Sequence, residues 1–545
     1  MLRFKTYVVV ASGGNLLASL SPNGIGERSS ENMKFKKITA IVLCAAAAVG
    51  ISGCGGQNKE TAGTEKKLEI WMPLNSSAAS VMKSFNESPL AKELAEKTGI
   101  NAQYVHPPQG QELEKFNLLV ASDTLPDIIT YNWLKYPGGP QKAIREKVIT
   151  DLNQYKDKAP NLISYLDAHE DFKKLALTDE GQLFAFPFIR SEESLCISSG
   201  LVIRKDWLDE LGMALPETID EWETVLTAFK EKKGASAPFG ATSLSYFCGG
   251  FGTWNDYYVD NGEIKYGPFD EGYKDFIVTM NRWYKNGLID QDFATLDSKT
   301  VHSNILNGVS GAMTGSIGSG IGAVASAASD IPGFKLAGAP YPAPVKGQKP
   351  EFGSYQLPVP AETLAHSAIT TTCSDMDSAL KYLDFGYSEE GHMLYNFGIE
   401  GESYEMIDGY PKYTEKITNN PEGLSMTSAL ANYTLSYRAG PFVQDVRYME
   451  QYAALPEQKE AWENWSACNS GEHTLPNLYM KEDELSRFAD ISNSVSTYLN
   501  EKMLKMIIGT EPIENYDQML EELRARGAEE LREMYQSAYD RYAAR

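Results

Sequence analysis

The chain has 545 residues, of which 42% are hydrophobic and 23% are charged, as in ordinary globular proteins. Its formal net charge of −23 argues against nucleic acid and other polyanions as default partners, because phosphate backbones bind to basic surfaces. The length exceeds what a single hydrophobic core supports, so we expect two or three cores.

Residues 33–54, MKFKKITAIVLCAAAAVGISGC, have the layout of a secretory signal. Three lysines precede a short apolar run, and small residues precede Cys54. The apolar run is shorter than the roughly 20 residues that cross a bilayer, which argues against a transmembrane helix. A cysteine after such a run resembles a bacterial lipoprotein signal, which implies that residues 33–53 are removed and that Cys54 is acylated. A cleaved signal without a lipid is the alternative.

The segments on either side of this signal are not expected to belong to the fold. Residues 54–66 are mostly polar and would tether the mature protein to the outer face of the cell membrane. Residues 1–32 precede a complete signal whose natural first residue is Met33, so an upstream start codon explains them best.

The chain contains six cysteines. Cys44 leaves with the signal, and Cys54 is the expected lipid attachment site. The others, Cys196, Cys248, Cys373 and Cys468, are widely spaced and form no C-x-x-C pair, which fits neither a disulfide framework nor a zinc site. Buried free thiols are expected, with one disulfide bridge as the alternative.

Residues 67–132 alternate between strand-like and helix-like patterns. Strands are expected at 67–72, 101–106 and 127–132, and apolar residues at helical spacing occupy 81–94 and 113–120. This order predicts a parallel sheet with right-handed crossovers, in which ligands bind beyond the carboxyl ends of the strands. Residues 72–76 and 131–136 are therefore expected on one rim.

A second region of α/β character follows. Residues 201–203 are strand-like, and Thr218 with Glu221 forms a capping-box pattern at the start of a helix that extends to Lys230. The remaining expected segments are a helix at 276–286, a glycine-rich strand-to-loop passage at 308–322, an extended proline-rich linker at 340–360, a helix at 377–385 and a docked terminal helix at 531–542.

Short motifs are spread along the whole mature chain, and none is decisive alone. They are KTGI at 97–100, ASDTLPD at 121–127, YPGG at 136–139, ITDL at 149–152, APN at 159–161, IRKDWL at 203–208, PET at 216–218, GLID at 287–290, GIEG at 398–401 and AYDRY at 538–542. In this order they resemble the solute-binding lipoproteins of ATP-driven importers, in the LipO-type branch that includes alginate-oligosaccharide binders.

The resemblance implies an α/β fold of the periplasmic-binding-protein-like type II architecture. Such a fold has two α/β lobes, a ligand cleft between them and a hinge that the chain crosses several times. Lobe 1 is expected at 67–190 and 362–425, and lobe 2 at 195–345 and 430–545. The crossings are expected at 187–197, near 359–369 and near 420–435.

The resemblance also implies a function. The chain is expected to be the extracellular substrate-binding component of an ABC transporter, a monomer that closes on a solute, expected to be an oligosaccharide, and delivers it to a membrane permease. Neither a cofactor nor enzymatic activity is expected. Many relatives carry a calcium loop after the helix ending at Lys230. Calcium takes about six to eight oxygen ligands, and residues 229–239 contain a single carboxylate, so no metal is expected there.

Aromatic residues make up 11% of the chain, and rings beside hydrogen-bonding groups suit the faces and hydroxyls of sugars. The expected ligand-binding residues are Asn75, Tyr131, Asn132 and Trp133 on the rim, Phe188 and Arg190 near the hinge, Tyr246, Trp254, Asn255 and Ser316 in the second lobe, and Glu400 with Tyr404. Trp133 and Trp254 are the two most strongly expected ligand contacts, because both are expected in loops beside polar residues. Core packing is the alternative for each. Trp207, Trp222 and Trp283 are expected in the core.

Four of these residues have a second possible role or a specific position in the fold. Arg190 suits a carboxylate or a pair of hydroxyls, and it equally suits a hinge salt bridge. Ser316 lies where proteins of this fold often present the start of a helix to the ligand. Glu400 and Tyr404 lie in a family-like motif, where tight turn packing is slightly favoured over ligand binding.

The sequence contains no H-E-x-x-H, G-x-S-x-G, Walker A or G-x-G-x-x-G motif. Residues 318–322 are too short for the last of these and are expected to be a flexible turn. One alternative function is a surface-anchored glycoside hydrolase or polysaccharide lyase, because a catalytic carboxylate pair is recognised only by its spacing in the fold. The other is a ligand sensor that docks to a membrane receptor.

Overall fold

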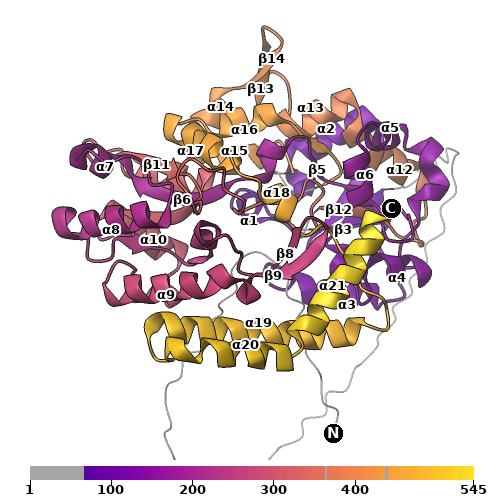
Figure 1. Cartoon of the computed structure of the whole chain (residues 1–545). Helices are drawn as coiled ribbons and strands as arrows, with labels where there is room; N and C mark the ends of the chain where they lie inside the picture. Colours follow the sequence, from indigo (N-terminus) through magenta and orange to yellow (C-terminus); the bar gives the residue numbers. More distant parts are fainter. Residues whose placement is uncertain (1–66, 362–364, 436–439) are drawn as a thin grey trace, which may run out of the picture. The chain divides into compact units, whose positions relative to one another are not determined.

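A computed structural model describes residues 67–361, 365–435 and 440–545 (Figure 1). The expected signal at 33–53, the tether and Cys54 lie outside the described residues. None of the helices in the described ranges is long and apolar enough to cross a membrane.

Lobe 1 is built on a five-stranded sheet with the order β2-β1-β3-β12-β4. Its strands are β1 (Leu68–Trp71), β2 (Ala102–Val105), β3 (Ile128–Tyr131), β12 (His366–Ile369) and β4 (Phe186–Pro187). Strand β1 pairs in parallel with β2 and β3, whereas β12 is antiparallel to both β3 and β4. The three parallel strands expected from residues 67–132 are confirmed.

Seven longer helices surround this sheet. They are α2 (Pro89–Thr98), α3 (Glu112–Val120), α4 (Gly139–Arg145), α5 (Pro160–Ala168), α6 (Glu170–Ala176), α12 (Met376–Asp384) and α13 (Glu389–Phe397). The helix expected at 81–94 starts later than expected. A short helix α1 (Ser76–Ala79) and a 3₁₀ turn (Phe85–Glu87) come before α2. Helix α2 begins only at Pro89, which needs no hydrogen bond at the first position, and Ser88 caps it by accepting from the Ala91 N–H.

Lobe 2 is built on a four-stranded sheet with the order β11-β6-β10-β7. Its strands are β11 (Leu336–Ala339), β6 (Ser199–Arg204), β10 (Ala312–Ser316) and β7 (Phe239–Gly240), and its helices are α7 (Lys205–Leu211), α8 (Ile219–Lys233), α9 (Glu271–Lys285), α10 (Ser298–Leu306) and α11 (Ala323–Ala327). Thr218 caps α8 as expected, because its hydroxyl accepts from the Glu221 N–H. In a capping box the Glu221 carboxylate would accept from the Thr218 N–H, whereas here it accepts from the N–H of the preceding residue, Glu217.

The glycine-rich passage after β10 is not a flexible turn. Residues Ile317–Gly322 form one π-helical turn that runs directly into α11. The turn packs back on the strand, because a Cβ atom at Gly320 would lie 2.9 Å from the Cα atom of Gly315. The glycines permit this close approach, so the expectation of a flexible turn is wrong.

The tryptophans and cysteines of lobe 2 behave as expected. Trp222 and Trp283 are fully buried and Trp207 is 9% exposed, all within one apolar cluster. Across the described chain, Cys196, Cys248 and Cys468 are buried, Cys373 is partly buried, and all four are free thiols.

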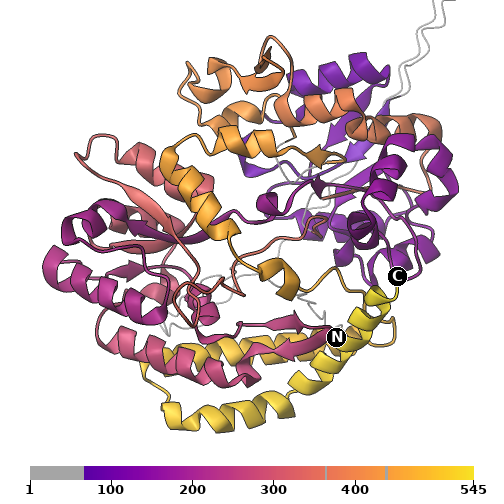
Figure 2. The ribbon, with the colours of Figure 1, turned by 45° about the horizontal axis from the view of Figure 1, so that its top comes forward.

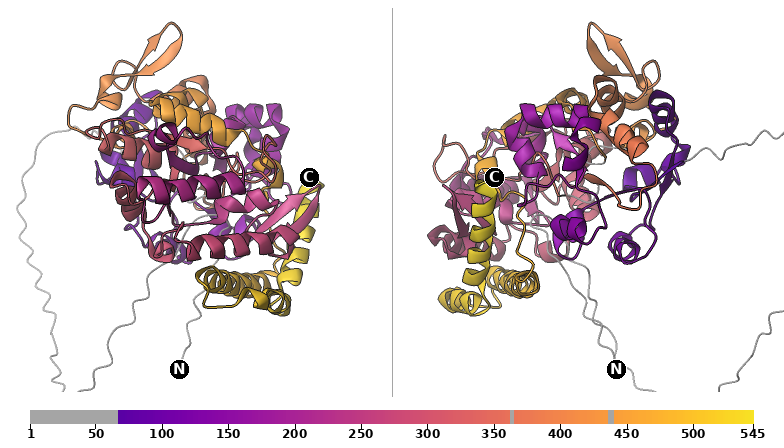
Figure 3. Two further views of the ribbon diagram at one scale, coloured as in Figure 1. Left: turned by 60° about the vertical axis from the view of Figure 1, so that its left-hand side comes forward. Right: turned by 90° about the vertical axis from the view of Figure 1, so that its right-hand side faces the viewer.

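A third group of elements packs on the far face of the lobe 2 sheet. It contains the hairpin β13 (Tyr404–Ile407) and β14 (Tyr410–Tyr413), followed by α14 (Glu415–Thr418), α15 (Met426–Leu430), α16 (Val446–Tyr452), α17 (Pro456–Ser466) and α18 (Ser470–His473). The hairpin stands out from the surrounding helices (Figures 1 and 3). Phe397, Tyr413 and Trp465 share a core cluster with Val202 and Met313 of the sheet. The lobe bounds expected from the sequence stay predictions.

The C-terminal helices α19 (Leu485–Ile508), α20 (Tyr516–Ala525) and α21 (Ala528–Ala543) follow. Helix α21 is docked as expected, with Leu531 and Ala538 buried. At its start the Tyr257 hydroxyl of the β8 (Tyr257–Asp260) and β9 (Glu263–Tyr266) ribbon donates to the Ala528 carbonyl at 2.9 Å. At its end Arg541 and Arg545 both contact Asp179, which follows α6 of lobe 1. The C-terminus therefore lies beside lobe 1 (Figure 2).

His366 makes the stability of lobe 1 depend on pH. The residue is 3% exposed in β12, neither ring nitrogen has a hydrogen-bond partner, and burial lowers its pKa to about 3. An unfolded histidine has a pKa of about 6.5, so between about pH 6.5 and 3 the unfolded chain binds a proton that the folded chain does not. The stabilisation is complete above the unfolded pKa and is lost as the pH falls towards 3.

We therefore expect the free energy of unfolding to fall by up to about 1.4 kcal/mol for each pH unit in this window through His366 alone. His366→Leu removes the titrating group and keeps a buried side chain of similar size. Urea denaturation at about pH 7 and about pH 4.5 should show a smaller loss of stability in this variant than in the wild type. Equal losses in the two proteins would contradict the assignment.

Candidate ligand-binding site

The carboxyl ends of the mutually parallel lobe 1 strands β1, β2, β3 and β4 lie at one edge of the sheet. Strands β1 and β3 are parallel with Trp71 level with Ile129, so residues 72–76 and 131–136 leave the sheet at the same edge, as expected. Strand β4 ends and β12 begins there too, since Pro187 pairs with His366. The chain leaves lobe 1 from this edge.

The lobe 2 sheet has a corresponding edge. Ser199 opens β6 and is the cross-strand partner of Ser316, which ends β10. Strand β7 runs parallel to β10, so the loop that follows Gly240 and carries Tyr246 also leaves the sheet at this edge. The chain enters lobe 2 here from the segment that precedes Ser199.

Three chain segments connect the two lobes side by side. Strand β5 (Ile189–Arg190) pairs in parallel with β15 (Val443–Gln444), and we call this pair the crossing ribbon. The Arg190 N–H donates to the Pro358 carbonyl at 2.8 Å, which joins the second crossing to the ribbon. The third segment contains β15, and the expected crossing near 420–435 stays a prediction.

Arg190 fixes this arrangement. Its guanidinium donates to the Leu357 carbonyl at 2.5 Å and to the Gln356 side-chain oxygen at 2.8 Å, and the residue is 1% exposed. The cation therefore bonds the first crossing to the second and is not displayed on a surface.

A row of hydroxyl and amide side chains links the two sheet edges. Its members, which we call the polar row, are Asn75, Ser80, Ser199, Tyr246, Ser316, Ser319, Thr427, Ser428 and Tyr452. All nine are exposed or partly exposed. They come from lobe 1, from lobe 2 and from the segment that carries α15 and α16.

Within lobe 2 the polar row is held by contacts between neighbours. The Ser199 hydroxyl lies 3.3 Å from that of Tyr246, whose ring stacks on Tyr341 with centroids 6.2 Å apart. The hydroxyls of Ser316 and Ser319 lie 2.6 Å apart at the start of the π-helical turn. Ser316 thus stands at a helix start, as expected.

The row continues across to lobe 1 through Tyr452. A Cβ atom at Gly318 would lie 1.9 Å from the Tyr452 hydroxyl oxygen, so a larger residue at this position would displace the hydroxyl. The Tyr452 hydroxyl lies 3.3 Å from that of Thr427. The next residue, Ser428, has its hydroxyl 3.2 Å from that of Ser80, at the end of α1.

Asn75 completes the row at the lobe 1 edge. Its side-chain oxygen caps α1 by accepting from the Ala78 N–H at 2.9 Å, and its amide nitrogen donates to the Leu435 carbonyl at 3.4 Å. The row therefore offers neutral donors and acceptors from both lobes, the chemistry that binds a hydroxylated ligand.

Three of the four expected rim residues are buried, since Asn132 is 8% exposed and the two aromatic residues are in the core. Trp133 is fully buried and Tyr131 is 5% exposed, and both pack on Phe116 at centroid distances of 5.4 and 4.6 Å. A 3₁₀ turn causes this, because Asn132 caps it by accepting from the Leu134 N–H and the indole turns back to donate to the Ile129 carbonyl. The expectation that Trp133 lies outside the core is wrong.

The other expected residues divide between the core, the surface and the hairpin. Phe188 is fully buried against Phe442, and the Asn255 side-chain oxygen accepts from the Tyr273 hydroxyl in the lobe 2 core. Trp254 is partly exposed and stacks on Phe352 with the planes 13° apart. Glu400 is exposed and Tyr404 is buried beside Phe397, which supports the turn-packing interpretation.

Asn75, Tyr246 and Ser316, which the sequence indicated as ligand-binding residues, are members of the polar row, and the other members were not expected there. Ser199 adjoins Ser316 only through the register of two strands distant in the chain. One signal was present, since the hydroxyl-rich stretch Ser425–Ser428 lies in the segment expected to be the third crossing.

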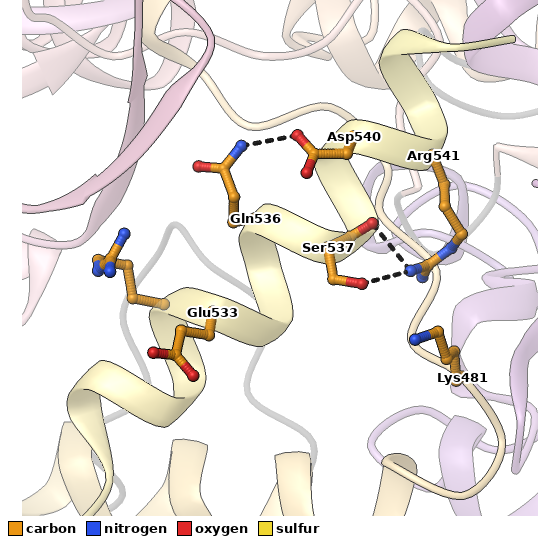
Figure 4. A pocket seen from close by; sticks show the side chains of 7 residues that line it. Lys481, Glu533, Gln536, Ser537, Asp540 and Arg541 are labelled. Atoms are coloured by element: carbon orange, nitrogen blue, oxygen red, sulfur yellow. Dashed lines mark hydrogen bonds between the residues drawn. The ribbon is translucent and has the colours of Figure 1, made fainter.

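A separate cavity of about 510 Å³ lies beside α21 and is lined by Lys481, Arg532, Glu533, Gln536, Ser537, Asp540 and Arg541 (Figure 4). Two pairs of its polar residues bond to each other: Gln536 donates to Asp540 at 2.8 Å, and Arg541 donates to the Ser537 carbonyl at 2.9 Å. We do not assign it a ligand. No group of three or more His, Cys, Asp or Glu side chains within the described ranges has the arrangement of a metal site.

Comparison with known proteins assigns a family to the chain. Residues 79–393 match the model of the bacterial extracellular solute-binding proteins. Lipoprotein LipO of Bacillus subtilis is 24% identical over 539 residues, which cover 92% of this chain and 99% of LipO. The fructooligosaccharide ABC transporter substrate-binding protein FusA of Streptococcus pneumoniae is 23% identical over 94% of this chain and 99% of its own.

Solved structures agree with this assignment. The alginate-binding protein AlgQ2, crystallised without calcium ion, has a TM-score of 0.68 with 24% identity and covers 87% of this chain and 98% of its own. An EF-hand mutant of Streptococcus pneumoniae FusA in complex with fructo-nystose has a TM-score of 0.68 with 20% identity, and the match covers 88% of this chain and 100% of that one. The α/β solute-binding-protein fold expected from the sequence is confirmed.

Proposed function

Because the chain belongs to the bacterial extracellular solute-binding proteins, we propose that it captures a neutral oligosaccharide at the polar row and delivers it to the permease of an ABC transporter. Proteins of this family bind solutes and are not enzymes, so the hydrolase and lyase alternatives are set aside. The observation that carries the proposal is the polar row, which joins hydroxyl and amide groups of both lobes at the edges where the chain crosses.

The names of similar proteins support an oligosaccharide. FusA is named for fructooligosaccharides, and two Bacillus subtilis relatives are named for polygalacturonan and rhamnogalacturonan and for melibiose, raffinose and stachyose. These names divide between neutral and acidic sugars, so the choice between the two classes depends on the residues of this chain.

The polar row favours a neutral sugar. Its nine members are uncharged, whereas uronic acids are bound best by arginine or lysine beside the carboxylate. Arg190, the cation of the crossing ribbon, bonds to Leu357 and Gln356. The net charge of −23 adds a general repulsion of polyanions.

The proposed mechanism is closure of the two lobes about the crossing ribbon. A ligand that bonds to Asn75 on one side and to Ser316 and Tyr246 on the other stabilises the form in which these groups are close together. Closure is then a population shift driven by the difference in ligand affinity between the two forms, without covalent chemistry. The partly exposed rings of Tyr246 and Tyr452 supply apolar faces for sugar rings.

We also propose that Cys54 carries the lipid that anchors the protein to the outer face of the cell membrane. The signal-like residues 33–53 and the relative named lipoprotein LipO support this. Cys54→Ala removes the only thiol at the start of the mature chain, so this variant should move from the membrane fraction to the medium. Unchanged membrane retention would contradict the anchor.

A sugar screen tests the proposed function. Ligand binding to the native state raises its melting temperature, so thermal shift with kestose, nystose, raffinose and stachyose should give stabilisation by at least one of them. Oligomers of alginate and polygalacturonate should give none. Stabilisation by the acidic oligomers alone would contradict a neutral ligand.

Variants then locate the site. Tyr246→Phe and Tyr452→Phe keep the rings and remove one hydroxyl each, so affinity for the bound sugar should fall roughly three- to tenfold, as for the loss of one hydrogen bond. Tyr410→Phe is the matched control, since its hydroxyl bonds to Glu450 near the hairpin, and its affinity should not change. Trp133→Leu should cost about 3 kcal/mol of stability with affinity retained. The reverse pattern would place the site elsewhere.

A further inference from the structure

The crossing ribbon presents two different faces. Successive residues of a strand point to opposite sides. Ile189 and Val443, which pair with each other, are both buried in the core of lobe 1. Arg190 and Gln444, the other pair, therefore lie together on the opposite face, where Arg190 reaches residues 356–357.

Gln444 is a buried amide without hydrogen bonds. The residue is 1% exposed, and neither its side-chain oxygen nor its nitrogen has a partner. The hydroxyl of Ser194 is also buried and unpartnered, in the 3₁₀ turn Glu193–Cys196 that packs on β5 and α16. Unpartnered buried polar atoms are rare and cost about 1–3 kcal/mol each, so a side chain that keeps two of them requires an explanation.

The neighbouring amide shows that this region can satisfy such a group. The Asn396 nitrogen donates to the carbonyls of Val443 and His392 at 2.8 and 2.9 Å, and its oxygen accepts from the Asp445 N–H at 2.9 Å. The Asn396 amide, on the lobe 1 side of β15, therefore has hydrogen-bond partners for both its oxygen and its nitrogen. The Gln444 amide has a partner for neither atom.

Gln444 is also linked along the chain to one member of the polar row, Tyr452. Helix α16 begins two residues later and ends at Tyr452, a span of about 10 Å. Asp445 sets the start of this helix by accepting from the Arg447 N–H at 2.8 Å, and it lies 2.8 Å from the His392 ring nitrogen. The amide and the Tyr452 hydroxyl are thus held at the two ends of one short helix.

We propose that Gln444 is a specificity-determining ligand contact at the base of the site, an inference that rests on the proposed function. Its oxygen accepts from one sugar hydroxyl while its nitrogen donates to the adjacent hydroxyl, a pairing that a primary amide makes and a carboxylate or ammonium does not. Because Gln444 is almost fully buried, the ligand reaches it when the lobes separate about the ribbon and is enclosed with it on closure.

The test compares two glutamines with opposite surroundings. Gln444→Met keeps the side-chain volume and removes both polar atoms. Since those atoms bond to nothing in the protein, the melting temperature should not fall, while Kd for the neutral sugar found by the kestose, nystose, raffinose and stachyose screen should rise tenfold or more. Gln451→Met is the control, because Gln451 accepts from the Tyr413 N–H and donates to the Pro411 carbonyl, both at 2.8 Å. It should lower the melting temperature and leave Kd unchanged.

A deoxygenated sugar completes the test. Monodeoxy derivatives of the bound sugar should include one that the wild type binds more weakly and that Gln444→Met binds as well as the parent sugar. An unchanged Kd in Gln444→Met, or a lower melting temperature with Kd retained, would overturn the assignment. Failure of the wild type to bind any of the four sugars would instead contradict the proposed function, and the melting temperature of Gln444→Met would still show whether the amide is structural.

Discussion

The parallel pairing of β5 with β15 is the constraint on which the rest of the structure depends. Each lobe has a sheet of its own, and two residues from each of these strands connect the lobes. The Arg190 N–H joins this pair to Pro358. The guanidinium of Arg190 adds bonds to two further residues of the second crossing. The first and second crossings leave each sheet at the same edge, where β4 ends and β12 begins in lobe 1 and where β6 begins and β11 ends in lobe 2. The pairing therefore determines which loops of the two lobes face one another.

The polar row follows from that constraint. Loops at the carboxyl ends of parallel strands are free of sheet hydrogen bonds, so their side chains are available to a ligand. In this chain the polar row consists of hydroxyls and amides, several of them paired across long stretches of sequence, such as Ser80 with Ser428. Helix α21 adds a further connection, since it starts in the core of lobe 2 and ends on Asp179 of lobe 1. Separation of the lobes must therefore move or bend this helix as well as the ribbon.

The sequence predicted the features that depend on local pattern. The spacing of apolar residues located the parallel strands of lobe 1 and the rim they form, and the motif order indicated the family. Features that depend on register or on one capping bond were not predictable. Trp133 follows a strand as expected, yet the turn capped by Asn132 returns its ring to the core. Ser199 joins the polar row only because it pairs with Ser316, more than a hundred residues away.

Hydrogen–deuterium exchange of the wild type with and without the bound neutral sugar tests the central claim most directly, because it reports on both lobes in one experiment. If the ligand is held at the polar row about the crossing ribbon, exchange should slow together at residues 72–80, 316–322, 426–434 and 442–452. Protection confined to one lobe, or centred on α21 and its cavity, would contradict the account.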